Sequence, residues 1–232
     1  MQLFACEFKI NKNQIILEDE SVLYQLRKVL RSKIWDNLFV QNNWNAINRY
    51  EIKIDKRDDK KLLWTIINII DNREPKNIYW MIVCMSNKWD KAEIIVQKLT
   101  EIGINHIVFW PSERSVIKEV NKNKIERLEK ISKEALEQSW WWNLPKIEFL
   151  YDLNDILINS SLIVFDKTLN IWKKLNVYEK KIYWLVWPEW WLTDKDYKKF
   201  SNNLEIQSFG ENVFRTETAA IIWWWIITKI RS

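Results

Sequence analysis

The chain has almost no glycine and an abundance of tryptophan. It contains 2 glycines and 17 tryptophans among 232 residues, whereas average usage predicts about 16 glycines for this length. A folded chain needs glycine where the backbone takes a positive φ, in tight turns and after the last turn of a helix. Tryptophan occupies several such turn-like places, at Trp35, Trp44, Trp89, Trp190 and Trp191. The largest side chain therefore stands where the smallest is expected.

The two unusual counts compensate each other. Together they make 19 residues, close to an ordinary complement of about 16 glycines and a few genuine tryptophans. Our hypothesis is that most of these positions are glycine in the native protein, because UGA codons of the gene mean glycine in the source and are written here as tryptophan. The alternative is a protein that is truly rich in tryptophan.

Composition and charge restrict the class of protein. Apolar residues make up 47% and charged residues 29%, a globular balance that allows one large domain or a medium domain with a small companion. No apolar run reaches the roughly 18 residues of a membrane helix, and the N-terminus lacks a signal-peptide pattern, so we expect a soluble, cytoplasmic protein. Cys6, Cys84 and the single His106 form neither a disulfide framework nor a zinc site, and no metal is expected. The net charge of +5 favours a polyanion such as RNA as partner.

The first 72 residues alternate short β-branched or aromatic runs with polar turns. A helix is predicted over residues 18–32, because its apolar residues recur at helical spacing. Residues 71–77 are polar, contain a proline and are predicted to be a linker. We therefore expect a small β-barrel domain over residues 1–72, with strands at residues 3–8, 14–17, 36–40, 47–54 and 61–70.

Strands and helices alternate from residue 77 onward. This rhythm predicts an α/β domain over residues 73–232, with a mostly parallel sheet covered by helices. Helices are predicted at residues 90–102, 122–139, 193–200 and 216–230, and strands at 78–85, 106–110, 161–166, 181–187 and 204–209.

Two late segments carry the best candidate site. WPEWWLT and FGENVFRTETAA each lead from a strand end into a helix, where open α/β folds bind ligands. Thr193 and Thr216 are predicted to cap the helices that follow, and Glu217 suits the positive end of a helix dipole. His106 begins a strand, so we interpret it as a structural residue.

Several ordered motifs carry a family resemblance. The chain resembles the ribosomal RNA small-subunit methyltransferase E family, whose pattern has K-G-D-K, Q-K-x-x-E-x-G, S-E-R-S, E-Q-S-G, G-P-E-G-G and L-R-T-E-T-A. The N-terminal VLRSKIWDNL is similar to that family's V-L-R-x-K-x-G-D-x-L. Almost every departure is tryptophan in place of glycine, which supports the decoding hypothesis. The matching segments are NKWDKAEIIVQKLTEIGI, FWPSERSVIK, EALEQSWW, LVWPEWWLT and FGENVFRTETAA.

The resemblance implies a fold and an activity. It implies a SPOUT methyltransferase domain with a C-terminal trefoil knot, preceded by a PUA-like β-barrel that binds RNA, in a homodimer. The implied reaction is methylation of N3 of a uridine in 16S ribosomal RNA of the small ribosomal subunit, with S-adenosylmethionine as cofactor. Two alternatives stay open: a catalytically inactive RNA-binding homologue, if the tryptophans of the cofactor loops are real, or a SPOUT enzyme that methylates ribose 2′-O.

The resemblance also implies residues for each role. Arg215 would stabilise negative charge on the uracil, and Glu217 would act as base or orient the amino group of the cofactor. The implied cofactor residues are Phe165, Asp166, Val186, Trp187, Pro188, Glu189, Trp190, Trp191, Phe209, Gly210, Val213, Phe214, Thr216, Thr218 and Ala219. The candidate RNA contacts are Arg27, Arg31, Lys33, Lys88, Lys91, Lys98, Arg114 and Gln138.

The decoding hypothesis makes a direct prediction. Protein purified from the native host should have an intact mass lower than that of the printed sequence, because each glycine weighs less than the tryptophan it replaces. Peptide mass spectrometry should locate the differences at the turn-like positions. An intact mass that matches all 17 tryptophans would rule the hypothesis out.

Overall fold

The fold is given by a computed structural model in which the chain divides into two compact units. The first comprises Met1–Glu74 and Lys133–Leu144, and the second Pro75–Ser132 and Pro145–Ser232. The predicted division at residues 72 and 73 stays a prediction. The structure describes residues 2–29, 36–43, 46–57, 62–72, 79–85, 88–157, 160–165, 182–186, 192–200, 204–207 and 213–230.

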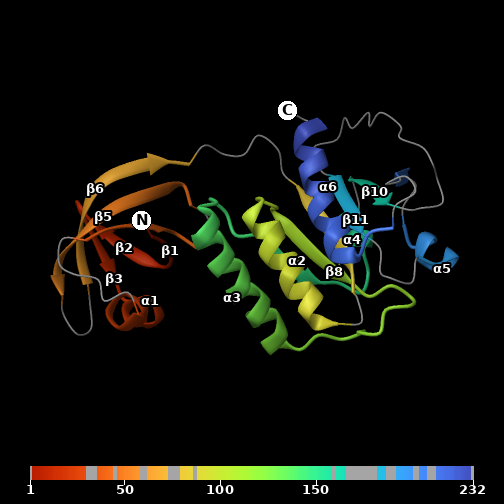
Figure 1. The fold of residues 1–232 in the computed structure, drawn as a ribbon, viewed down its shortest axis with the longest axis horizontal. Helices are drawn as coiled ribbons and strands as arrows, with labels where there is room; N and C mark the ends of the chain where they lie inside the picture. Colours follow the sequence, from red (N-terminus) through yellow and green to blue (C-terminus); the bar gives the residue numbers. More distant parts are fainter. Residues whose placement is uncertain are drawn as a thin grey trace. The chain divides into compact units, whose positions relative to one another are not determined.

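The first unit is built on a six-stranded sheet (Figure 1). All neighbouring strands pair antiparallel except β1 and β4, which are parallel. Five of the strands were predicted; β2, which forms a hairpin with β3, was missed. In spatial order the strands are β1 (Leu3–Ala5), β4 (Asn37–Gln41), β5 (Asn48–Arg57), β6 (Leu62–Asp71), β3 (Gln14–Leu17) and β2 (Phe8–Asn11).

The helix of the first unit is shorter than predicted. α1 (Glu20–Tyr24) begins after Asp19, whose side chain accepts hydrogen bonds from the first free N–H groups and so caps the helix. The chain then continues as a π-helical segment, Gln25–Val29. Its buried Leu26 packs with Val22 and Leu23 into the core of the sheet, so the apolar spacing located the helix correctly.

The C-terminal end of helix α3 (Lys122–Ser139) is held within the first unit by buried polar groups. The guanidinium of Arg49 donates to the side-chain oxygen of Gln41 at 2.8 Å and to the carbonyl of Trp140 at 3.0 Å. The carboxylate of Glu137 accepts from the backbone N–H of Ala5 at 3.0 Å. The bond from Arg49 thereby satisfies the carbonyl of Trp140, just beyond the last helical residue.

Trp140 takes a backbone conformation that favours glycine. It follows the last residue of α3 and has a φ of 60°, the left-handed conformation that commonly ends helices and is usually taken by glycine. A bulky residue is a rare occupant of this region. The same position is glycine in the E-Q-S-G pattern of the family that the sequence resembles, which supports the decoding hypothesis.

The second unit is an α/β sandwich around an entirely parallel six-stranded sheet. This confirms the α/β prediction, although the short β9 and α4 (Asn154–Leu157) were not predicted. In spatial order the strands are β12 (Leu204–Gln207), β10 (Ser161–Phe165), β11 (Ile182–Val186), β7 (Trp80–Cys84), β8 (His106–Trp110) and β9 (Lys146–Phe149).

Helices cover both faces of this sheet. α2 (Trp89–Glu101), α6 (Thr216–Ile230) and the first part of α3 pack on one face. α4 packs on the opposite face, as does Phe200, which follows α5 (Asp194–Tyr197). In Figure 1, α2 and α6 lie side by side over the sheet, and α5 lies apart from them.

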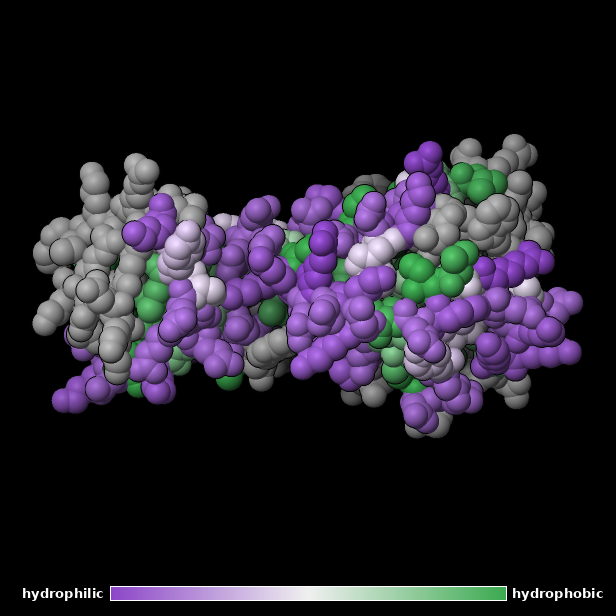
Figure 2. Space-filling model, turned by 90° about the horizontal axis from the view of Figure 1, so that it is seen from below, coloured by the Kyte–Doolittle hydropathy of each residue, from purple (hydrophilic) through white to green (hydrophobic). Residues whose placement is uncertain are grey.

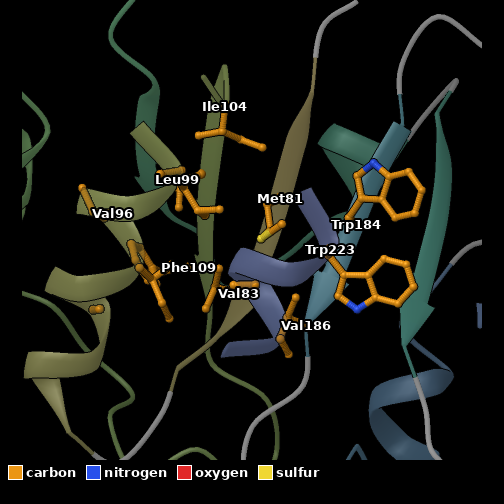
Figure 3. Close-up of a cluster of buried hydrophobic side chains, with 14 of the residues drawn as sticks. Met81, Val83, Val96, Leu99, Ile104, Phe109, Trp184, Val186 and Trp223 are labelled. Atoms are coloured by element: carbon orange, nitrogen blue, oxygen red, sulfur yellow. The ribbon is translucent and has the colours of Figure 1, made fainter. Parts of the chain in front are cut away.

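Figure 3 shows the core between the sheet and α2 and α6. Met81 and Val83 of β7 point toward Val96 and Leu99 of α2, and all four side chains are buried. Trp223 of α6 fills the space beside β11. Its ring centroid lies only 3.2 Å from that of Phe165, below the 4.5–7 Å of ordinary aromatic pairs. The indole therefore overfills this part of the core, as expected where a smaller native residue belongs.

The surface is mostly polar. Figure 2 shows hydrophilic residues over most of the visible face, with hydrophobic residues in small groups. Among the described helices, none is both long and apolar enough to cross a membrane.

The buried carboxyl of Glu137 makes stability depend on pH. Burial raises its pKa from 4.5 to about 7, so across this range the folded state binds more protons than the unfolded state and stability falls as the pH rises. Glu137→Gln keeps an acceptor for Ala5. We expect it to remove this fall and to exceed the wild type above the folded-state pKa by up to about 3 kcal/mol. Chemical denaturation over a pH series measures the difference.

Glu129→Gln provides the control for this variant. Glu129 lies on the same helix, about two turns before Glu137, and is exposed, so its substitution should leave the pH dependence as it is in the wild type. The prediction is wrong if both variants differ from the wild type by the same amount at every pH.

Candidate functional site

The predicted site residues of the second unit gather at one edge of the parallel sheet. Parallel strands end at the same edge, so the segments after β7, β8, β11 and β12 begin there. This edge, which we call the carboxyl edge, carries the first turns of α2 and α6, the loop at residues 111–115 and the start of α5. In open α/β sheets, ligands bind outside this edge.

The order of the strands marks one place along the edge. The chain moves from β7 outward to β8 and β9, and then returns to place β10 and β11 on the other side of β7. Open α/β sheets bind ligands at the point where the strand order reverses in this way. α2 follows β7 and α6 packs against β7 and β11, so both helices begin at the reversal.

A buried ion pair joins these two helices. The ammonium of Lys91, in the first turn of α2, lies 3.8 Å from Oε2 of Glu217, in the first turn of α6. Their side chains are only 15% and 16% exposed. Oε2 of Glu217 is buried and accepts no hydrogen bond from the described residues. The carboxylate therefore keeps acceptor capacity at the start of the helix.

Helix α6 begins one residue earlier than the capping prediction requires. Thr216 is its first helical residue and is buried. The carbonyl of Arg215 accepts the first helical hydrogen bond, from the N–H of Ala219 at 2.8 Å, so Arg215 occupies the cap position and the prediction of Thr216 as cap is wrong. The side chain of Arg215 is exposed at the same edge.

The loop after β8 is fixed to the start of α5 by hydrogen bonds. The backbone N–H of Glu113 donates to Oδ1 of the fully buried Asp196 at 2.8 Å. Thr193 and Asp196 form the predicted cap, with reciprocal bonds between side chains and backbone. The hydrogen bond from Lys195, with that from Thr193, lowers the pKa of the Glu113 carboxyl. The network leaves Arg114 exposed.

The predicted cofactor residues fall into two groups. Phe165 and Val186 are the buried last residues of β10 and β11. Around the start of α6, Val213 is exposed, Phe214 and Thr218 are half-buried and Ala219 is buried. The other group lies outside the described residues: Asp166, Trp187, Pro188, Glu189, Trp190, Trp191, Phe209 and Gly210.

The three lysines predicted as one basic edge lie at different places along α2 and have different partners. Lys88 is exposed just before α2, and Lys91 is the largely buried partner of Glu217. Lys98 lies in the last turn of α2, at the opposite end of the helix, where it pairs with Glu101 at 2.8 Å. A rise of 1.5 Å per residue places Lys91 and Lys98 at opposite ends of α2.

The remaining predicted RNA contacts belong to the first unit. Gln138 is exposed in the last turn of α3. Arg27 lies in the π-helical segment, but its side chain is outside the described residues, as are Arg31 and Lys33.

His106 lies at the opposite edge of the parallel sheet. As the first residue of β8, it contacts Glu148 through Nε2 at 2.7 Å and Tyr183 through Nδ1 at 3.3 Å. Burial is the main cause that lowers its pKa, and it favours the neutral ring. This position separates His106 from the candidate site, as its structural interpretation implied.

Sequence reasoning missed two features of the site. It did not pair Lys91 with Glu217, because 126 positions separate them and neither residue carries a signal for the other. It also missed Asp196 as the anchor of the loop at residues 111–115. The spacing T-x-x-D at residues 193–196 signals a capping box. The sequence therefore allowed the capping role of Asp196 to be predicted, but not its bond to Glu113.

Known proteins similar to this chain share an RNA methyltransferase domain or are named as ribosomal RNA methyltransferases. The RNA methyltransferase domain family matches residues 73–228. The ribosomal RNA small subunit methyltransferase E 2 of Borreliella burgdorferi is 31% identical over 140 residues, which are 59% of this chain and 56% of that protein. The ribosomal RNA small subunit methyltransferase E of Bacillus subtilis is 37% identical over 91 residues, 38% of this chain and 35% of that protein. The chain thus spans about half or less of these curated relatives.

A solved structure shares the fold. The ribosomal RNA small subunit methyltransferase E of Neisseria gonorrhoeae, bound to S-adenosyl methionine, aligns with a TM-score of 0.82. The alignment covers 99% of this chain and 98% of that chain at 16% identity.

Asp196 supports a prediction about the loop at residues 111–115. Asp196→Ala removes a buried acceptor from the N–H groups of Glu113 and Thr193, so we expect a loss of about 1–3 kcal/mol in the free energy of unfolding. Hydrogen exchange at the Glu113 amide should become faster. The control is Asp194→Ala, an exposed first-turn residue of the same helix. Equal losses in both variants would show that Asp196 does not anchor the loop.

Proposed function

Because the chain belongs to the RNA methyltransferase domain family, we propose that it methylates N3 of one uridine in 16S ribosomal RNA, with S-adenosylmethionine as donor. The match to residues 73–228 is the observation that carries the proposal. This stretch holds the parallel sheet and every element of the carboxyl edge. The curated relatives that are named as small-subunit ribosomal RNA methyltransferases support the choice of RNA.

The residues of the carboxyl edge fit the proposed cofactor. S-adenosylmethionine, when bound, supplies a methyl group activated by a positively charged sulfur, and it carries an ammonium donor. The free acceptor capacity of Glu217 suits such a donor. The buried ends of β10 and β11 offer an apolar floor at the strand reversal. The cofactor contacts proposed at Asp166, at residues 187–191 and at Phe209 and Gly210 lie outside the described residues.

The chain's own residues have distinct tasks in the transfer. N3 of uracil must lose its proton, so negative charge develops on the ring. Arg215, exposed at the start of α6, stabilises that charge, and the helix N-terminus acts in the same sense. The carboxylate of Glu217 accepts the N3 proton of the uracil or a hydrogen bond from the ammonium of the cofactor. Arg114, presented by the loop that Asp196 holds, contacts the RNA beside the target base.

RNA binding extends to the first unit in this proposal. Arg27, Arg31, Lys33 and Gln138 contact phosphates or sugars, which gives affinity rather than choice of sequence. A PUA-like assignment of the six-stranded sheet, a C-terminal trefoil knot, a homodimer, a cytoplasmic location and recognition of the small ribosomal subunit complete the proposal. The insertion of β11 between β7 and β10 is compatible with a knotted crossover.

The decisive test is the state of the ribosomal RNA in the native host. Deletion of the gene should remove one N3-methyluridine from 16S ribosomal RNA, and restoration of the gene should return it. Mass spectrometry of nuclease fragments measures the modification. A mutant whose 16S ribosomal RNA keeps every methyluridine would refute the proposed target.

A second measurement separates the enzyme from an inactive homologue. Calorimetry with purified protein should detect binding of S-adenosylmethionine, and Arg215→Ala should lower the methylation rate more than it lowers cofactor affinity. Lys122→Ala, an exposed substitution on α3, is the control. Absence of cofactor binding by the native protein would favour an RNA-binding homologue without catalysis.

A further inference from the structure

We propose that Lys91 is a positioning residue for the methyl transfer, which acts by holding the carboxylate of Glu217 in place at the start of α6. This inference rests on the proposed function and gives one of its candidate RNA contacts a different role. The ion pair of 3.8 Å between the two side chains is the observation that carries it.

The two helices bring the residues together from distant parts of the chain. α2 follows β7 and α6 follows β12, and they lie side by side on one face of the sheet (Figure 1). Both begin at the carboxyl edge. Lys91 lies in the first turn of α2 and Glu217 in the first turn of α6. The pair therefore faces the end of the sheet where the reaction is proposed.

The position of Lys91 is unfavourable for the stability of its own helix. The N-terminus of a helix carries a partial positive charge that favours acids and disfavours cations. Lys91 stands in the first turn of α2 beside the first turn of α6, so two positive helix ends surround its ammonium. Asp90 satisfies the usual preference of α2 for an acid. Lys91 directly follows Asp90 in the chain, and only 15% of the Lys91 side chain is exposed. The negative charge of Glu217 stabilises the ammonium there.

The ion pair leaves hydrogen-bond acceptor sites of the Glu217 carboxylate unused. At 3.8 Å the contact is a charge–charge attraction that is too long for a hydrogen bond. Oε2 of Glu217 accepts no hydrogen bond within the described structure although it is buried. An ionised carboxylate has about four acceptor sites. Lys91 thus holds the carboxylate in place without using the lone pairs that a substrate N–H or a cofactor ammonium needs.

Other charged groups near the pair are arranged differently. Lys88 and Asp90 are exposed at the start of α2, and Arg215 is exposed before α6. On the strands packed against α6, the titratable Cys84 and Tyr183 belong to the cluster on the opposite face of the sheet. Farther along α2, Glu93 pairs with Arg127 and Lys98 with Glu101. Among the described residues, Lys91 is therefore the charged group that pairs with the Glu217 carboxylate.

Lys91→Met tests the inference because it removes the charge and keeps the length of the side chain. A carboxylate that loses its partner charge is no longer held in one place, so it leaves the geometry that the transfer needs. We expect kcat for RNA methylation to fall about tenfold while KM for the RNA stays within about twofold of the wild type. Lys91→Arg should restore most of kcat.

The control removes an ion-paired lysine from the first turn of another helix. Lys122 is the first residue of α3 and pairs with Glu126 at 3.5 Å on the surface. Lys122→Met should leave both kcat and KM unchanged. Circular dichroism of each variant verifies that the fold is retained.

A second readout does not depend on activity. Carbon NMR of the Glu217 side chain should show faster side-chain motion in Lys91→Met than in the wild type. Unchanged motion of this side chain overturns the inference, as does a loss of activity that Lys91→Arg does not restore. If the wild type methylates no RNA, the proposed function fails, and the NMR measurement still decides whether Lys91 holds Glu217 in place.

Discussion

The parallel pairing of the second sheet is the constraint on which the candidate site depends. Ile163 pairs with Trp184 and Trp184 with Met81, so these side chains lie on the α6 face, whereas the neighbouring Leu162 and Tyr183 lie on the other. A shift of one residue would exchange these faces. The buried, strongly apolar strands thus fix the register, and the register brings Lys91, Arg114, Thr193 and Glu217 to one edge although they are far apart in sequence.

The sequence predicted those elements whose apolar pattern is long or fully buried. β8, α3 and α6 begin and end where they were predicted, because core packing imposes their periodicity. β2 has mostly exposed residues and was missed, and β9 is a short strand at the edge of its sheet. Motifs identified the loops of the site, but the pairing of Lys91 with Glu217 could not be predicted because it follows from the packing of α2 against α6.

The tryptophan pattern acts on packing and backbone more than on the chemistry of the site. Trp140 stands where a helix ends in a left-handed conformation. Trp64 and Trp184 each bury an indole N–H that finds no acceptor among the described residues, and such a group costs about 1–3 kcal/mol. Glycine at position 140 would remove the unfavourable backbone conformation, and glycine at positions 64 and 184 would remove the buried indole N–H groups. Lys91, Asp196, Arg215 and Glu217 are not tryptophan, so the contacts argued from them hold under either decoding.

The charges of the carboxyl edge nearly cancel, so the arrangement of Glu217 matters more than the sum. The basic residues described there face a matching set of acids: Lys88, Lys91, Arg114, Lys195 and Arg215 against Asp90, Glu113, Asp194, Asp196 and Glu217. Glu113 and Asp196 accept hydrogen bonds from Lys195 and from the N–H of Glu113, whereas the buried Oε2 of Glu217 accepts none from the described residues. In the proposed reaction this acceptor is available to the methyl donor, and Arg215 to the negative charge that develops on the uracil, because an interaction made only in the transition state raises the rate.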